Sequence, residues 1–312
     1  MNSPLLRIGT RGSPMALHQA SEVRDVLIAA HPSLAEPHAI EIVAIKTTGD
    51  RIQDRSLAEI GGKGLFTKEI EEALFDRRID LAVHSAKDIP TWLPDGLALA
   101  CFLERGDPRD AFVSVDAADF GDLPANATIG TGSLRRQAQI LNRWPNLKVL
   151  PIRGNADTRI RKVAAGQFDA TLLGIAGLRR IGREDAARKL LSPEEMLPAA
   201  AQGTVAVEIR ADDDQARAWL APVNHAETAL RIAAERALLD ELQGSCRTPI
   251  AGLAEIDPVG KLTLRALVAM PDGSVLHRTT ESGPSADAVG IGRAAGKALK
   301  AMGSRAFFDA IR

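Results

Sequence analysis

Apolar residues follow two spacings along the first two thirds of the chain, one typical of strands and one typical of helices. Short apolar runs, or apolar and polar residues in alternation, predict strands, and apolar residues three or four positions apart predict the buried face of a helix. The predicted strands are residues 5–8, 39–45, 80–84, 97–103, 111–115, 127–129, 147–152, 169–173 and 205–209. The predicted helices are residues 15–30, 66–74, 156–165 and a helix that begins at Leu134. Because strands and helices alternate, we expect βαβ units and mainly parallel sheets.

Two features divide this pattern into lobes. Residues 104–110 are polar and turn-rich, which predicts a linker, and the alternation of strand and helix restarts after them. The strand at 205–209 comes late in the chain, and its position predicts a return to the first sheet. We therefore expect one α/β lobe made of residues 1–104 and 203–221, and a second α/β lobe made of residues 105–202.

The last part of the chain, residues 222–312, has a different pattern. The predicted helices here are residues 226–242 and 286–302, and the predicted antiparallel strands are residues 262–268 and 274–276. This mixture predicts a small α+β domain. The sequence as a whole therefore predicts the α/β class with three domains.

Composition excludes several classes of protein. The chain has 312 residues, 45% hydrophobic and 25% charged, as is ordinary for a soluble globular protein of two or three domains. Its formal net charge is −1, so no overall field draws it to nucleic acid or to a membrane surface. Aromatic residues make up 4% and tyrosine is absent, which argues against a binder of single strands. Because no apolar run approaches the roughly 20 residues of a membrane span and residues 1–11 lack a signal-peptide pattern, we expect a cytoplasmic protein.

Only two cysteines occur, Cys101 and Cys246, and neither lies in a CxxC pair. Their spacing argues against a disulfide scaffold and a zinc ribbon, and no His/Cys cluster has the spacing of metal ligands, so we expect no metal. Cys101 lies in an apolar strand and is interpreted as a small buried residue. Cys246 lies in a Gly/Ser-rich loop beside Arg247, where a thiol is accessible and its thiolate is favoured, although an isolated cysteine is usually inert.

Positive charge is concentrated between residues 130 and 182, which hold ten Lys and Arg residues against two Asp residues. Some of these cations fit solvated helix faces, namely Arg143, Lys148 and Lys162. Five others are predicted at strand ends or helix starts, beside Gly and Ser, and these are Arg135, Arg136, Arg153, Arg159 and Arg180. Ligands bind at such positions in open α/β sheets, where backbone N–H groups favour anions and Arg offers a bidentate fork to carboxylate or phosphate. We therefore expect an anion site.

A second candidate is the segment from His84 to Asp88, which follows a buried strand and can project side chains into a crevice. An Asp beside a Lys is usually a weak surface pair, but at a crevice mouth a carboxylate can stabilise a developing cation and transfer protons. His84 is weaker evidence, because a satisfied structural histidine gives the same pattern. The glycine-rich pieces at 61–64 and 130–133 lack the spacing of phosphate-binding loops and are interpreted as turns.

Several segments, taken together and in this order, resemble the porphobilinogen deaminase (hydroxymethylbilane synthase) family over essentially the whole length. The segments are residues 7–17 with Gln19, 61–66, 82–90, 107–112, 133–136, 153–155 with Thr158 and Arg159, 176–178 and 244–246. The resemblance implies three domains, two of them α/β lobes like those of periplasmic binding proteins with a cleft between them, and a third that carries a cofactor. It implies a transferase that condenses four porphobilinogen molecules head to tail with loss of ammonia, then releases the linear tetrapyrrole hydroxymethylbilane by hydrolysis.

The resemblance also implies roles for individual residues. The cofactor of the family is a dipyrromethane held through a thioether, and the matching anchor here is Cys246, while the matching catalytic carboxylate is Asp88. The residues implied to hold the cofactor together with these two are Lys87, Thr131, Gly132, Ser133, Arg135, Arg136 and Arg159. The residues implied to bind substrate are Arg11, Ser13, Gln19, Lys63, Arg153, Arg159 and Arg180. We expect a monomer that binds porphobilinogen and has no metal, nucleic-acid or membrane partner.

Three positions depart from the pattern of the family. Glu59 stands where a lysine is common, Gly132 where a serine is usual, and Ala201 where a glycine is usual, near a predicted crossing between lobes. The main alternative to an enzyme is a non-catalytic anion-binding protein of the same two-lobed fold. Cys246 and the pair Lys87-Asp88 argue against that alternative, because a simple binder needs neither. Low aromatic content and a neutral total charge disfavour a nucleic-acid binder.

Overall fold

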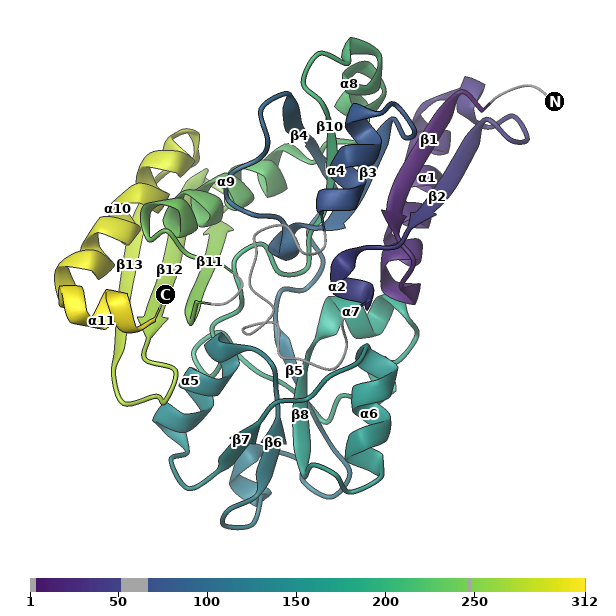
Figure 1. Cartoon of the computed structure of the whole chain (residues 1–312). Helices are drawn as coiled ribbons and strands as arrows, with labels where there is room; N and C mark the ends of the chain where they lie inside the picture. The colour runs from purple at the N-terminus through teal and green to yellow at the C-terminus, as the bar shows by residue number, and fades with distance from the viewer. Residues whose placement is uncertain (1–3, 52–66, 246–247, 312) are drawn as a thin grey trace. The chain divides into compact units, whose positions relative to one another are not determined.

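The computed structural model describes residues 4–51, 67–245 and 248–311, and Figure 1 shows the order of their helices and strands. The chain divides into two compact units. The first unit comprises Met1–Asp54, Gly62–Gly106 and Thr204–Ala229, and the second comprises Arg55–Gly61, Asp107–Gly203 and Leu230–Arg312. None of the helices in the described part of the chain has both the length and the hydropathy that a membrane crossing requires.

The first unit is built on a five-stranded sheet with the order β2-β1-β3-β10-β4. Its strands are β1 (Leu6–Arg11), β2 (Ile40–Ile45), β3 (Leu81–Ser85), β4 (Leu97–Phe102) and β10 (Val205–Arg210). β1 is parallel to β2 and β3, whereas β10 is antiparallel to both β3 and β4. The predicted return of the chain to the first sheet is confirmed. One strand departs from the expected parallel arrangement, because β10 enters between β3 and β4 in the opposite direction, while the other four strands run the same way.

Helices cover both faces of this sheet. α1 (Pro14–Ala30) and α8 (Asp214–Leu220) pack on one face, where Val23, Leu27 and Leu220 join the apolar side chains of the strands. α4 (Lys68–Phe75) packs on the other face through Ile70 and Leu74. The remaining described elements of this unit are η1 (Pro32–Leu34), α2 (Thr48–Arg51), η2 (Ala86–Asp88), η5 (Ala221–Val223) and the start of α9 (Ala226–Glu241). The result is a three-layered α/β lobe.

The second unit contains another five-stranded mixed sheet, with the order β7-β6-β8-β5-β9. Its strands are β5 (Asp110–Ser114), β6 (Thr128–Gly130), β7 (Lys148–Leu150), β8 (Ala170–Gly174) and β9 (Lys189–Leu190). β6 is parallel to β7 and β8, and β5 is antiparallel to β8 and β9. Its other elements are η3 (Phe120–Asp122), α5 (Leu134–Arg143), α6 (Ala156–Ala164), α7 (Ile175–Arg180) and η4 (Glu184–Ala186). α5 packs on one face of the sheet, and α6 and α7 pack on the other.

The predicted linker at 104–110 is wrong at its C-terminal end. Asp110 is the first residue of β5 and has no exposed surface. Its strand is paired on both sides, since Ala111 lies opposite Leu173 of β8 and Leu190 of β9. The start of the strand could not be predicted from the sequence, because the residues before Asp110 are polar and turn-forming. The sequence around a carboxylate also does not show whether that carboxylate is buried or exposed.

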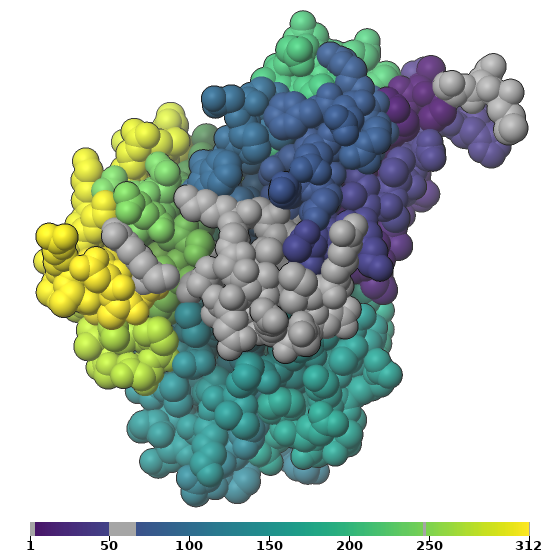
Figure 2. All heavy atoms as spheres, in the orientation of Figure 1, coloured from purple at the N-terminus to yellow at the C-terminus, as the bar shows by residue number. Residues whose placement is uncertain are grey.

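The C-terminal domain belongs to the second unit and has a three-stranded antiparallel sheet. Its strands are β11 (Ile250–Ile256), β12 (Lys261–Ala269) and β13 (Leu276–Pro284), which lie in sequence order. α10 (Ala288–Met302) follows the short η6 (Ser285–Asp287), and α9 and α10 share one apolar core with the sheet. α11 (Arg305–Ala310) comes after α10, and Figure 2 colours the surface of this C-terminal end of the chain yellow. The predicted α+β class is confirmed. The predicted strand at 274–276 is wrong, because a turn through Gly273 precedes β13, and β13 is too polar to give an apolar signal.

Candidate active site

In the first unit, several predicted site residues follow the strands β1 and β3. These strands are parallel neighbours, so their carboxyl ends meet at the same edge of the sheet. Arg11 ends β1, and Ser13 caps the helix that follows, with its hydroxyl accepting from the backbone of Ala16 at 3.3 Å. Lys87 and Asp88 lie in η2, directly after β3. One edge of the sheet thus holds a cation, a helix N-terminus and the predicted catalytic carboxylate.

The turn that carries Asp88 is fixed by its apolar neighbours. Ala86 and Ile89 are buried, and the backbone N–H of Ala86 donates to the carbonyl of Thr204 at 3.0 Å. Lys87 is exposed and Asp88 is half-buried. The backbone under Asp88 is therefore held in place while its carboxylate stays outside the core, as a group that meets a ligand requires.

Gln19 lies in α1 and is buried against β3. Its side-chain amide donates to the Ser85 hydroxyl at 3.0 Å, and the Ser85 hydroxyl lies 3.1 Å from the amide oxygen. This pair joins the first helix to the strand that leads to Asp88. In this structure Gln19 therefore contacts the strand beneath the predicted catalytic turn.

His84 fits the structural interpretation. It is buried, and its Nε2 lies 3.0 Å from the carboxylate of Glu208 on the neighbouring strand β10. Glu208 has no exposed surface. The imidazole therefore has a buried partner inside the sheet, and we assign it no role at the surface of the site.

In the second unit, the predicted cofactor and substrate residues follow three parallel strands. β6, β7 and β8 lie side by side, so the segments after them meet at one edge. Thr131 and Ser133 follow β6, Arg153 follows β7, and Arg180 ends the helix after β8, where its guanidinium donates to the carbonyl of Gly203 at 3.3 Å. Arg159 lies in α6, the helix that follows the segment containing Arg153 in the chain. The prediction that these arginines lie at strand ends or helix starts is confirmed for Arg153 and Arg159, but it is wrong for Arg180, which ends its helix.

The loop between β6 and α5 is shaped by two hydroxyl groups. The Ser133 hydroxyl accepts from the backbone of Arg136 at 3.4 Å and caps α5, and the Thr131 hydroxyl accepts from the backbone of Ser133 at 3.2 Å. Gly132 between them is exposed. A Cβ on Gly132 would lie 3.6 Å from the carbonyl of Ile152, which is ordinary contact, so the serine that is usual in the family would fit here.

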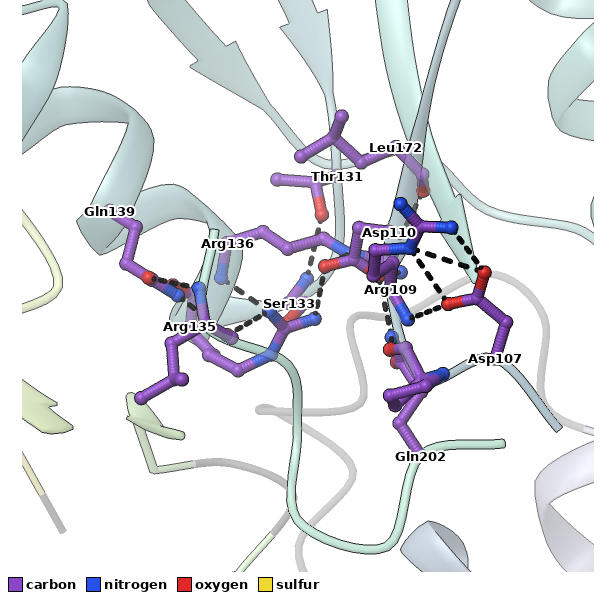
Figure 3. A network of polar contacts seen from close by, with 12 residues as sticks. Asp107, Arg109, Asp110, Thr131, Ser133, Arg135, Arg136, Gln139, Leu172 and Gln202 are labelled. Atoms are coloured by element: carbon purple, nitrogen blue, oxygen red, sulfur yellow. Dashed lines mark hydrogen bonds and ion pairs between the residues drawn. The ribbon is translucent and has the colours of Figure 1, made fainter. Parts of the chain in front are cut away.

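Arg135 and Arg136, the first turn of α5, are both buried and both bind one carboxylate, that of Asp110 (Figure 3). Arg135 donates from Nη2 to Asp110 Oδ2 at 2.8 Å. Arg136 donates from Nη2 to Oδ1 at 2.7 Å and from Nε to Oδ2 at 3.3 Å. Each guanidinium also donates to a backbone carbonyl at 2.8 Å, that of Leu197 for Arg135 and that of Leu172 for Arg136.

Gln202 completes this network from the segment that leads back to the first unit. Its amide donates to Asp110 Oδ1 and to the carbonyl of Pro108, both at 2.8 Å. The neighbouring Ala201 has a left-handed φ of 62°, a conformation that the glycine usual in the family adopts without strain. Asp110 and Gln202 were missed as site residues, because their contacts join segments far apart in the chain.

The ionisation of Asp110 is secured by its partners. Burial alone would raise the pKa of this carboxyl, but the charges of Arg135 and Arg136 outweigh burial and hold the pKa well below its ordinary value. Burial lowers the pKa of Arg135, while Asp110 opposes that shift. One anion thus faces two buried cations.

Arg159 adds a third cation beside this pair. Burial, then the charges of Arg136 and Arg153, lower the pKa of Arg159 from 12.5 to about 10. Its Nε donates to the carbonyl of Gly154 at 3.0 Å. Because two neighbouring cations repel the charge of Arg159, binding of an anion at this place is favourable. The donor set therefore fits a group that carries several carboxylates.

Four residues of the prediction lie outside the described residues: the expected anchor Cys246, its neighbour Arg247, the expected substrate residue Lys63 and the departure at Glu59. Across residues 4–51, 67–245 and 248–311, no group of three or more His, Cys, Asp or Glu side chains could hold a metal ion.

The fold and this site define a class: a three-domain α/β protein with buried arginines at the carboxyl edge of a sheet. Two family models match the chain, "Porphobilinogen deaminase, dipyromethane cofactor binding domain" over residues 6–218 and "Porphobilinogen deaminase, C-terminal domain" over residues 229–301. The chain belongs to the porphobilinogen deaminase family. The prediction made from the sequence motifs is confirmed, and the chain is an enzyme of this family with a dipyrromethane cofactor-binding domain.

Similar proteins match along nearly the whole chain. The chloroplastic porphobilinogen deaminase of Oryza sativa subsp. japonica is 52% identical over 310 residues, covering 99% of this chain and 87% of the relative. The porphobilinogen deaminase of Nitrobacter winogradskyi is 50% identical over 304 residues, covering 97% of this chain and 95% of the relative. Among solved structures, the methionine-binding protein MetQ matches with a TM-score of 0.44 and 13% identity, covering 74% of this chain and 94% of that chain.

Proposed function

We propose that this enzyme condenses four porphobilinogen molecules head to tail, with loss of ammonia at each step, and then releases hydroxymethylbilane by hydrolysis. The observation that carries the proposal is the set of three buried or half-buried cations, Arg135, Arg136 and Arg159, with Asp110 between the first two. Each porphobilinogen carries an acetate and a propionate, so the growing chain gains two carboxylates per unit. Arginine forks match such groups in charge and in geometry.

The dipyrromethane cofactor fits the edge of the second sheet. We propose that Arg135, Arg136 and Arg159 hold its carboxylates, and that the loop of Thr131, Gly132 and Ser133 adds hydroxyl and backbone N–H donors. Lys87 and Asp88 of the first unit are proposed to contact it too, and Cys246 to carry the thioether. When bound, the cofactor supplies the pyrrole carbon to which substrate units are added.

Substrate carboxylates are proposed to meet a second set of donors. Arg11 and Ser13 stand at the end of β1 and the start of α1, where a helix N-terminus favours an anion. Gln19 supports the strand beside them through Ser85. The remaining members of this proposed set are Lys63, Arg153, Arg159 and Arg180.

Asp88 is proposed as the catalytic carboxylate. Departure of ammonia from porphobilinogen leaves a cation spread over the pyrrole ring, and a carboxylate beside the ring nitrogen stabilises that cation and can hold its proton. The turn at 86–88 fixes the backbone from which the Asp88 carboxylate extends. We expect Asp88→Asn to lower kcat about 100- to 1000-fold without unfolding the protein. A folded Asp88→Asn protein with near-normal turnover would contradict the assignment.

The mass of the intact protein tests the whole proposal. The wild-type chain should carry an added mass equal to two porphobilinogens less two ammonia, either as purified or after addition of porphobilinogen. Cys246→Ala should carry none, and Cys101→Ala, the matched control, should be modified like the wild type. A folded wild-type chain that takes up no such mass would favour the alternative, a non-catalytic anion-binding protein.

The setting of the enzyme is also a proposal. We propose a cytoplasmic monomer that needs neither nucleic acid nor a membrane. Cys101, the described cysteine, is a free and buried thiol, which fits a reducing compartment. Cell fractionation tests the compartment, and light scattering during gel filtration tests the monomer. The three predicted domains, 1–104 with 203–221, 105–202 and 222–312, stay a proposal that limited proteolysis can examine.

A further inference from the structure

We propose that Asp110 is a positioning residue for the binding of ligand carboxylates. It holds the guanidinium groups of Arg135 and Arg136 in a fixed orientation, and it neutralises only one of their two positive charges, so that the other is left for the ligand. This inference rests on the proposed function, and it concerns a residue that itself touches neither substrate nor cofactor. The structure places the Asp110 carboxylate between Arg135 and Arg136 with no exposed surface (Figure 3).

The carboxylate of Asp110 is fixed from both sides. Its backbone begins β5, opposite Gly174 of β8, so the strand pairing sets where the side chain starts. The amide of Gln202 donates to Oδ1 at 2.8 Å and opposes rotation of the group. A carboxylate held in this way can keep flexible arginine side chains in one orientation.

The count of donors shows what is left for a ligand. Two guanidinium groups carry ten N–H donors. Three of their hydrogen bonds go to Asp110 and two go to the carbonyls of Leu197 and Leu172. The Nε of Arg135 is buried and has no hydrogen-bond partner within the described chain. Donor capacity and one positive charge therefore remain after Asp110 has been satisfied.

The balance of charge in this cluster points the same way. Buried charges are expensive unless each is compensated by a partner of opposite sign. Here one anion serves two cations, and Arg159 stands close enough for the charge of Arg136 to lower its pKa. The site is balanced only when a further anion joins it, and Asp110 determines how the forks are presented to that anion.

The test compares Asp110→Asn with Asp107→Asn as the matched control. Asp107 is a nearby carboxylate that pairs with Arg109 and Arg179, outside the proposed site. The full-length proteins are incubated with porphobilinogen, and the rate at which the dipyrromethane mass appears is followed at increasing concentrations of sodium sulfate. We expect Asp110→Asn to slow the uptake about tenfold or more, because the guanidinium donors of Arg135 and Arg136 are then no longer held in the orientation that binds the ligand. We also expect sulfate to inhibit it at concentrations several times lower, because unopposed guanidinium groups capture inorganic anions.

The sulfate dependence separates positioning from mere stability. A structural role alone would lower the rate by the same factor at every sulfate concentration, and that result would overturn the inference, as would a rate like that of Asp107→Asn. If Asp110→Asn does not fold, Asp110→Glu keeps the charge but moves the carboxylate by one methylene. We expect Asp110→Glu to take up dipyrromethane slowly but to show the same sulfate dependence as the wild type. A rate of uptake equal to that of the wild type would overturn the inference. A wild-type chain that lacks the dipyrromethane mass both as purified and after incubation with porphobilinogen would instead refute the proposed function.

Discussion

Burial and neighbouring charges act together on the arginine side chains of the second unit. Asp110 opposes the charges of Arg135 and Arg136, and in return they keep it ionised at low pH. Arg159 is influenced by burial and by two cations instead, which is why its pKa is about 10. The cluster holds three arginines against one carboxylate, so it attracts further carboxylates.

The lowered pKa of Arg159 gives a testable pH dependence. Below pH 10 the side chain is charged and attracts carboxylates, and as the pH rises through about 10 it loses its proton and that attraction. We expect Arg159→Gln to slow dipyrromethane uptake about tenfold to 100-fold at pH 8, as is typical for a hydrogen bond to a charged group. The ratio of wild-type to variant rates should approach one above pH 10.

Titration of groups that are present in both experiments, including the amine of the substrate, affects the two rates equally and therefore cancels in their ratio. Arg161→Gln is the control, because Arg161 is exposed on the same helix and donates to Thr158. A ratio that stays constant from pH 8 to pH 11 would show that Arg159 does not act through its charge.

At the scale of elements, the site depends on short segments that turn sharply after the strands. Gly154 lies between β7 and α6 with a φ of 106°, and a Cβ there would lie 2.5 Å from the Thr158 methyl group. Asn155 then caps α6 by accepting from the backbone of Thr158 at 2.9 Å. Arg153 precedes this turn and Arg159 follows it, and the Nε of Arg159 donates to the Gly154 carbonyl.

We expect Gly154→Ala to lower the free energy of unfolding by at least about 1–3 kcal/mol, because alanine is strained at this φ and also collides with Thr158. Urea titration measures the loss. Gly166→Ala is the control, because Gly166 also has a left-handed φ, 69°, but faces open space. It should lose only about 1 kcal/mol, the cost of the conformation alone. Equal losses in the two variants would show that the contact with Thr158 has no effect.

The sequence predicted most strands of the two lobes within two or three residues, because their cores are apolar. It could not give the direction of β10, since direction depends on partners that lie elsewhere in the chain. It also missed β13, whose exposed residues alternate without an apolar run. At the site, the positions of the arginines were predictable from glycine and serine beside them. The counter-charge at Asp110 was not, because only the pairing of β5 with β8 brings it to α5.

At the scale of the whole molecule, the chain has two cysteines with different expected roles. Cys101 lies in β4 in the core of the first unit, and burial raises the pKa of its thiol to about 12. Cys246 falls within residues 229–301, which match the family's C-terminal domain model, and it is the proposed anchor. A count of reactive thiols therefore reports two separate events, folding of the first unit and loading of the cofactor.

We expect native, cofactor-loaded protein to react with no iodoacetamide, and unloaded protein to react once, at Cys246. In urea, loaded protein should react once, at Cys101, at the concentration where the first unit unfolds. Intact mass counts the added groups, and Cys101→Ala shows which thiol reacted. Rapid alkylation of Cys101 in the native protein would contradict the burial described here.

β10 lies between β3 and β4, although it is made about a hundred residues after them. During synthesis at about 5–20 residues per second, the two strands wait roughly 5–20 s with unpaired edges. The lobe that leaves the ribosome first is thus completed after most of the second lobe has emerged. Unpaired strand edges invite association with other chains, so the nascent protein is most exposed to aggregation in this interval, and a chaperone that shields strands would act on it then.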